Sequence, residues 1–135
     1  MSIAQAYEST TRDVRVRVAP EYMAERSSPE DARYFWTYAI EIANLGPVAV
    51  QLISRHWRIT DASGRVEHVR GPGVVGETPV IGPGEIFSYT SGCPLRTPSG
   101  IMTGTYEMEV IGGERFDAAI PTFSLDSDNG KRALN

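Results

Sequence analysis

Along most of this chain, apolar residues recur at every second position, and glycine or proline interrupts the runs. The segment 12–20, RDVRVRVAP, places three valines on one face and charged residues on the other. The segment 34–44, YFWTYAIEIAN, does the same with Trp36, Tyr38 and Ile40. A period of two is typical of a half-buried β-strand, whereas a helix requires a period near 3.6. The 13 glycines and nine prolines supply the turns that such strands need, so the sequence predicts an antiparallel β-protein.

Seven or eight short strands follow from this pattern, and we predict them at residues 12–20, 34–44, 48–61, 65–70, 78–81, 85–92, 104–110 and 115–120. Long loops are expected at 21–33 and 93–100. This arrangement favours an all-β fold, an immunoglobulin- or fibronectin-III-like antiparallel β-sandwich. Cys93 is the only cysteine, so the bridged pair of antibody domains is absent and the fibronectin-III-like variant is favoured.

The segment 48–61 changes its apolar phase midway. Val50 and Leu52 share one parity, whereas Trp57 and Ile59 share the other. A slip of one residue is what a β-bulge, or a strand that bends between two sheets, produces. We therefore predict an irregularity of this kind within the segment.

The length and net charge of the chain limit the number of domains it can form and the kinds of partner it can bind. Its 135 residues fit one domain, 1–135, whose ends at about 1–10 and 126–135 are expected to fray. Seventeen acidic and thirteen basic residues give a formal net charge of -4, which argues against nucleic acid as a partner. We see neither a signal peptide nor an apolar run long enough to cross a bilayer, so we expect a cytoplasmic protein without membrane insertion.

The stretch RGPGVVGETP begins at Arg70 and carries Gly71, Gly73 and Gly76 in the G-x-G-x-x-G spacing of dinucleotide-binding turns. Those turns place a helix N-terminus behind the glycines, facing the pyrophosphate. The two prolines of the following segment ETPVIGPGE exclude a helix of useful length. The spacing therefore does not indicate a dinucleotide site.

Two interpretations of this loop remain open. The glycines either supply left-handed turns and close packing over the end of the sandwich, or they expose backbone N–H groups that bind a small anion. In the second interpretation Arg70 supplies counter-charge, and Glu77 either holds a phosphate-bridging magnesium ion or repels the anion. The candidate anion loop consists of Arg70, Gly71, Gly73, Gly76 and Glu77.

No catalytic constellation stands out in the sequence. Cys93 precedes a proline in a predicted loop, without a helix N-terminus or a base that would lower the pKa of its thiol. Glu107 and Glu109 share the solvent face of a predicted strand, and exposed carboxylates lack the burial that raises the pKa of a general acid. We predict no catalytic residue and no cofactor.

The chain has only two histidines, His56 and His68, and no spacing typical of a zinc site. His56 is the one residue kept as a candidate metal ligand, although a hydrogen bond to a neighbouring loop is the favoured role. Glu67 and His68 are adjacent on a strand and therefore point to opposite faces, which makes them poor partners for one ion. We predict no metal site.

A longer signature runs from His56 to Met108, HWRITDASGRVEHVRGPGVVGETPVIGPGEIFSYTSGCPLRTPSGIMTGTYEM. It resembles the ApaG family, in which a His-Trp pair, a glycine-rich GVVGE and a Gly-x-Met-x-Gly-x-Tyr recur. The matching residues are His56 and Trp57, Asp61 and Gly64, Gly73 to Glu77, Pro83 and Gly84, Tyr89 and Ser91, Leu95 and Thr97, and Gly100, Met102, Gly104 and Tyr106. Thr78 departs from the pattern, because the family commonly has Gln there, so no role of that amide carries over.

The resemblance implies a small fibronectin-III-like sandwich. It also implies an association with cobalt and magnesium resistance or efflux, without transport activity. Because the domain recurs in eukaryotic proteins as an interaction module, the resemblance favours a binding role, and it supplies no catalytic residue.

The leading hypothesis is thus a non-enzymatic binding module with a protein partner, linked indirectly to divalent-cation homeostasis. The alternative is a phosphate- or nucleotide-binding protein, hydrolytic in one version, that uses the loop 70–77. An edge strand of the sandwich also offers a route to a homodimer.

Overall fold

The computed structural model describes residues 6–127, most of which belong to β-strands. Its nine strands are β1 (Tyr7–Thr11), β2 (Val14–Tyr22), β3 (Tyr34–Asn44), β4 (Val50–Asp61), β5 (Val66–Pro72), β6 (Val80–Ile81), β7 (Ile86–Leu95), β8 (Ser99–Val110) and β9 (Arg115–Asp126). Two short 3-10 helices, η1 (Ala24–Arg26) and η2 (Pro29–Asp31), lie in the connection between β2 and β3. Within residues 6–127 there is no helix with the length and apolar character needed to span a membrane.

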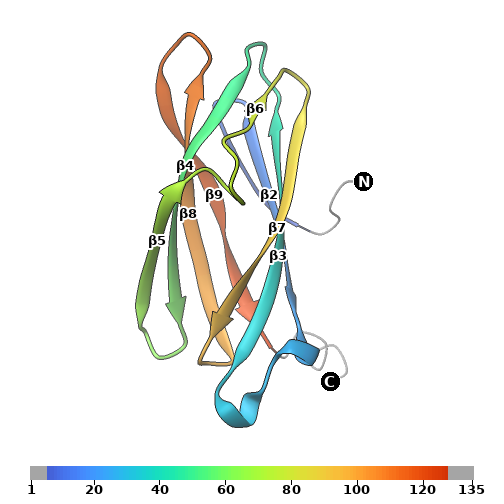
Figure 1. Cartoon of the computed structure of the whole chain (residues 1–135), viewed down its shortest axis with the longest axis vertical. Helices are drawn as coiled ribbons and strands as arrows, with labels where there is room; N and C mark the ends of the chain where they lie inside the picture. Colours follow the sequence, from blue (N-terminus) through green and yellow to red (C-terminus); the bar gives the residue numbers. More distant parts are fainter. Residues whose placement is uncertain (1–5, 128–135) are drawn as a thin grey trace.

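The strands form two antiparallel sheets that pack face to face, as Figure 1 shows. One sheet has the order β1-β2-β3-β7, and the other has the order β5-β4-β8-β9, with β6 also paired to β4. The predicted all-β sandwich is therefore confirmed. The strand count exceeds the predicted seven or eight because β1 was not expected.

The prediction of a frayed N-terminal end at about 1–10 is wrong for residues 7–10, which are paired together with Thr11. They form β1, which pairs with β2 in a continuous register from Tyr7↔Val18 to Thr11↔Val14. The sequence of β1, YESTT, lacks apolar alternation, and all five residues of this edge strand are exposed or half-buried, so periodicity gives no signal of the strand.

The predicted loop at 93–100 is also mostly strand. Residues 93–95 extend β7, and β8 begins at Ser99, which leaves only a tight turn between them. Pro94 is tolerated in β7 because β7 lies at the edge of its sheet, where a missing N–H need not break a ladder. The remaining parts of the expected frayed ends, 1–5 and 128–135, lie outside the described residues.

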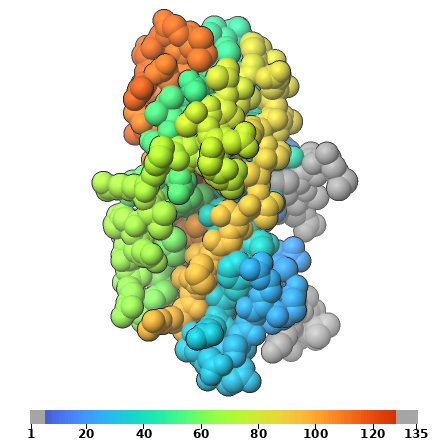
Figure 2. All heavy atoms as spheres, viewed as in Figure 1, coloured from blue at the N-terminus to red at the C-terminus, as the bar shows by residue number. Residues whose placement is uncertain are grey.

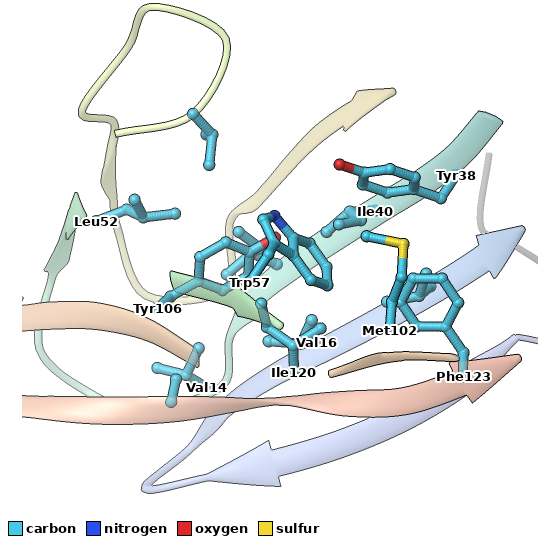
Figure 3. Packing of buried hydrophobic residues seen from close by; sticks show 14 of the residues in the cluster. Val14, Val16, Tyr38, Ile40, Leu52, Trp57, Met102, Tyr106, Ile120 and Phe123 are labelled. Atoms are coloured by element: carbon cyan, nitrogen blue, oxygen red, sulfur yellow. The ribbon is translucent and has the colours of Figure 1, made fainter. Parts of the chain in front are cut away.

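Large side chains from both sheets fill the core, and Figure 3 shows how they interlock. Trp57 stands at its centre, with ring centroids 5.4 Å from Tyr38, 6.0 Å from Phe123 and 6.5 Å from Tyr106. All three contacts are edge-on, the geometry that the aromatic quadrupole favours. Trp57 belongs to one sheet and Tyr38 to the other, so this cluster joins the two layers.

The predicted irregularity in the segment 48–61 is confirmed as a register shift. Where β4 pairs with β8, Leu52 lies opposite Met108 and Ser54 lies opposite Glu107, so Ile53 is the extra residue. This insertion is a β-bulge, and it lets apolar residues of opposite parity on its two sides face the same core.

β8 approaches β4 closely at Gly104, which lies opposite Trp57. A Cβ atom placed on Gly104 would lie 2.3 Å from the carbonyl oxygen of His56, far inside van der Waals contact. Because the obstacle is backbone, it cannot swing away as a flexible side chain could. Glycine is therefore required at this position by packing alone.

Gly104→Ala is expected to lower the free energy of unfolding by about 3 kcal/mol, since overpacking against backbone forces the two strands apart. Gly113→Ala is the matched control: the atom nearest to its Cβ would be Val110 Cγ1 at 3.4 Å, an ordinary contact. The control should change stability by less than about 1 kcal/mol. Urea denaturation followed by tryptophan fluorescence measures both, and equal stability of the two variants would contradict the crowding at Gly104.

Candidate functional site

The glycine loop, residues 70–77, links β5 to the segment that leads into β6. Its tip is a two-residue turn in which Val75 (φ 42°) and Gly76 (φ 80°) are both left-handed. Val74 and Glu77 flank this turn and exchange two backbone hydrogen bonds of 2.8 Å each. No helix lies between the loop and β6, so the exclusion of a dinucleotide-binding turn holds.

Several backbone N–H groups of the loop are already used inside the protein. The N–H of Gly73 donates to the carbonyl of Ile53 at 2.8 Å, and those of Val74 and Glu77 donate to each other's carbonyls. Among the loop residues outside β5, only Val75 and Gly76 have N–H groups without a hydrogen bond to the described residues. The anion-binding interpretation of the loop stays a prediction, and it would depend on those two groups.

The other candidate residues of the loop lie apart from its tip in the fold. Arg70 belongs to β5 and sits opposite His56 of β4. Both residues line a shallow hollow on the outer face of the five-stranded sheet. Gly71 also lies in β5, whereas Glu77 is exposed at the base of the turn.

Arg55 is the residue that the sequence analysis missed. Its Nη1 donates to the carbonyls of Pro72 and Gly73 at 3.1 and 2.9 Å, which ties the loop to β4. A Cβ atom on Gly71 would lie 3.1 Å from that same nitrogen. Arg55 has the parity of the buried Trp57, so the sequence did contain a signal that it faces inward. Together with Val74, which is 1% exposed and inserted in the core, Arg55 fixes the loop in place.

Gly73→Ala is expected to lower the free energy of unfolding by about 3 kcal/mol. Its φ of 59° strains any side chain, and its Cβ would lie 2.1 Å from the carbonyl oxygen of Glu77. Gly76→Ala is the control, because its φ of 80° carries a similar strain but no atom lies within 4 Å of its Cβ. The control should cost about 1 kcal/mol. Thermal and urea unfolding measure the difference, and a smaller loss for Gly73→Ala than for Gly76→Ala would contradict the clash.

The two histidines meet on the outer face of the five-stranded sheet. His56 Nε2 and His68 Nδ1 are 2.9 Å apart, and the rings stack with centroids separated by 5.2 Å. The prediction that His56 bonds a neighbouring loop is wrong, because its partner lies on the adjacent strand β5. The contact runs diagonally between two neighbouring cross-strand pairs of β4 and β5. The separation of the two histidines along the sequence does not reveal it.

Two imidazoles fall short of the three or four donors that a closed metal site uses. Within residues 6–127 no group of three or more His, Cys, Asp or Glu side chains could hold a metal ion. The pKa of His56 lies below its ordinary value of 6.5, because partial desolvation, the charge of Arg70 and the neighbouring His68 all disfavour the protonated ring. The histidine pair and Arg70 therefore form this surface, and together they do not supply the set of donors that a closed metal site uses.

His56 is expected to titrate below pH 6.5. Arg70→Gln should raise that pKa, because it removes a positive charge that opposes protonation. Arg58→Gln, which removes an exposed charge from β4, serves as the control and should move it less. NMR titration of the imidazole Hε1 resonance measures each pKa, and a value for His56 unchanged by Arg70→Gln would refute this account.

The other side chains tested for catalysis are held in structural roles. Cys93 is buried, and desolvation followed by the charge of Glu67 raises the pKa of its thiol to about 12, so it is not a thiolate near neutrality. Glu107 and Glu109 both pair with Arg115, at 3.4 and 2.9 Å. Burial therefore holds Cys93, and ion pairs with Arg115 hold the two carboxylates.

One end of the sandwich carries exposed aliphatic side chains, and we call it the apolar end: Leu45, Val48, Val80, Ile86 and Ile111. Each is between 44 and 55% exposed. They come from the β3–β4 loop, β6, the start of β7 and the β8–β9 turn, which gather at the upper end of Figure 1. Single exposed aliphatic residues are ordinary, but a group from four segments marks a surface that can bind.

Asn44 holds the apolar end together. Its side chain is buried, and Nδ2 donates to the carbonyls of Val48 and Ile81, both at 2.9 Å. Its own N–H donates to the carbonyl of Glu85, and its carbonyl accepts from the N–H of Gly84. One residue thus joins the β3–β4 loop and β6 through its side-chain amide and the turn before β7 through its backbone, so the exposed side chains stand on a fixed backbone.

Comparison with known proteins gives consistent matches. The family model described as the ApaG domain matches residues 24–110. The chain is 55% identical over 129 residues to Protein ApaG of Beijerinckia indica and 57% identical over 129 residues to Protein ApaG of Allorhizobium ampelinum. Each alignment covers 96% of this chain and 99% of the relative. The crystal structure of an ApaA protein from Bordetella pertussis superposes with a TM-score of 0.84 at 47% identity, over 87% of this chain and 95% of that chain.

Proposed function

Since this chain belongs to the ApaG family, we propose that it is a non-enzymatic interaction module that binds a protein partner through its apolar end. The observation that carries the proposal is the grouping of five half-exposed aliphatic side chains on one fixed end of the sandwich. Interfaces draw their affinity from apolar anchors at the centre of a patch. A rigid backbone beneath the patch lowers the entropy lost on binding.

The size of the apolar end favours a short segment of a partner protein over a second copy of the chain. Five half-exposed aliphatic side chains present a few hundred Å² of surface, roughly the largest patch of an ordinary monomer. A stable dimer buries about 800 Å² on each partner. We therefore assign the apolar end to an apolar peptide segment, and pairing of edge strands into a homodimer is the competing outcome.

The family also supports a wider role. We propose that this binding activity acts in the cytoplasm and contributes indirectly to cobalt and magnesium resistance or efflux. In that role the protein would position another component rather than move or ligate ions, because no three metal-ligating side chains gather within residues 6–127.

Leu45→Ser combined with Val48→Ser is expected to reduce capture of the partner by at least about tenfold, because each half-exposed anchor contributes roughly 1 kcal/mol. Val66→Ser is the matched control, since Val66 is 40% exposed on β5, away from the apolar end. A protein recovered in stoichiometric amount by the wild type and by Val66→Ser would be purified, and its dissociation constant measured with all three baits.

Equal binding of that purified protein to all three baits would refute the assigned surface. Sedimentation velocity of the chain alone shows whether it forms a homodimer. The double substitution would abolish such a dimer only if the apolar end formed the dimer contact. Measurable turnover of phosphorylated metabolites would contradict the non-enzymatic assignment.

A further inference from the structure

A second hollow lies at the end of the sandwich opposite the apolar end. Its cavity volume is about 630 Å³, within the range of small-molecule sites. Its walls come from the η1–η2 connection, the start of β3, the β4–β5 turn and the end of β7. Figures 1 and 2 show these segments meeting at the lower end of the molecule. We call it the arginine pocket, because Arg26, Arg33, Arg65 and Arg96 line it.

The four arginines that line the pocket come from three segments, the β2–β3 connection, the β4–β5 turn and the β7–β8 turn. Arg33, Arg65 and Arg96 make no side-chain hydrogen bond or ion pair with the described residues. Arg26 lies over the ring of Phe35, 4.2 Å from its centroid, and this contact leaves its N–H groups free to donate. The pocket therefore gathers N–H donors that have no hydrogen-bond partner among the described residues.

Three carboxylates also line the pocket, and two of them have partners inside the protein. Asp61 Oδ1 accepts from the N–H and the hydroxyl of Ser63 at 2.9 and 2.7 Å, and from the N–H of Arg65 at 3.0 Å. Asp31 accepts from the hydroxyl of Ser28 at 2.8 Å. These contacts shape turns but leave the carboxylates charged, so Asp31, Asp61 and Glu67 all oppose an entering anion. Four guanidinium groups against three carboxylates leave the lining positive.

Hydrogen bonds between loops fix the walls. Thr97 Oγ1 accepts from the N–H of Ala62 at 3.0 Å and donates to the carbonyl of Ser99 at 2.8 Å. Thr97 follows Arg96, and Ala62 lies in the turn that leads to Arg65, so this threonine joins the two arginine-bearing turns. A pocket fixed in this way loses little entropy when a ligand enters.

On the opposite wall, Ser28 and Arg33 exchange two backbone hydrogen bonds of 2.7 and 3.0 Å. Between them Ala32 adopts a left-handed φ of 54°, which is uncommon for a residue other than glycine. Non-glycine residues in this conformation cluster at binding sites, where the surrounding structure maintains the strain. This turn fixes the backbone from which Arg33 extends.

The chemistry of the lining defines the ligand class. A guanidinium group offers paired N–H donors in a plane that matches two oxygens of a phosphate or carboxylate. All basic residues of this chain except Lys131 are arginines, so its cationic surface is suited to such paired contacts. We infer that the arginine pocket binds a small oxyanion that carries two or more negative charges, as phosphate or carboxylate. This site is independent of the protein interaction proposed for the apolar end.

Isothermal titration with pyrophosphate and, separately, with citrate tests this assignment on the full chain at low ionic strength. We expect saturable binding of at least one anion and a loss of affinity of about tenfold or more in Arg65→Gln and in Arg96→Gln, since each removes charge-assisted hydrogen bonds. Arg58→Gln is the matched control, because it removes the same charge from an exposed site on β4 outside the pocket. Circular dichroism verifies that each variant is folded.

Tighter binding of pyrophosphate would assign the pocket to phosphates, and tighter binding of citrate would assign it to carboxylates. Chemical shifts of the arginine Nε–Hε groups during the same titrations locate the bound anion. The absence of saturation by either anion up to roughly 10 mM would overturn the inference. Equal weakening by Arg58→Gln and Arg65→Gln would also overturn it, because the attraction would then reflect net charge alone.

Discussion

The bulge at Ile53 is the constraint on which much of this structure depends. It separates two halves of β4 that pair with different neighbours: Val50 and Gln51 pair with β6, whereas the stretch from Ser54 onward pairs with β5. The glycine loop is the connection that carries the chain from β5 to β6, the two strands that pair with these halves of β4. The carbonyl of Ile53 accepts the N–H of Gly73 at 2.8 Å and so holds the start of the glycine loop against β4. Without the bulge, the apolar side chains of one half of β4 would face solvent instead of the core.

The same slip explains why the three glycines of the loop are needed. Gly71 leaves room for the guanidinium of Arg55, which the bulge has turned toward the inside of the sandwich. Gly73 leaves room for the carbonyl of Glu77, and Gly76 adopts the left-handed conformation that closes the turn. Each glycine meets a separate steric or conformational demand of packing. A spacing that marks a dinucleotide site before a helix therefore arises here from the closing of a β-sandwich edge.

Local sequence periodicity was sufficient to predict the sandwich, the slip in β4 and the turns, because strand faces and turn residues are encoded within a few positions. It failed for β1, whose sequence carries no apolar stripe. It also failed for contacts between strands. The pairing of His56 with His68 depends on the register of β4 and β5, and the hydrogen bonds of Arg55 depend on where the fold brings Pro72 and Gly73. The arginine pocket was the feature least predictable from the sequence, because its arginines come from segments that only the folded topology brings together.

The two ends of the sandwich differ in chemistry although both are built from loops. At the apolar end, buried Asn44 satisfies the loop backbone, so the loop side chains are free to be aliphatic and exposed. At the opposite end, the side chains of Asp61 and Thr97 accept hydrogen bonds from backbone N–H groups of the β4–β5 turn. Arg33, Arg65 and Arg96 make no side-chain hydrogen bond or ion pair with the described residues. The net charge of -4 does not oppose this division. Glu107 and Glu109 of β8 pair with Arg115, whereas Arg33, Arg65 and Arg96 of the arginine pocket have no ion-pair partner within residues 6–127, so their charge is available to an approaching anion.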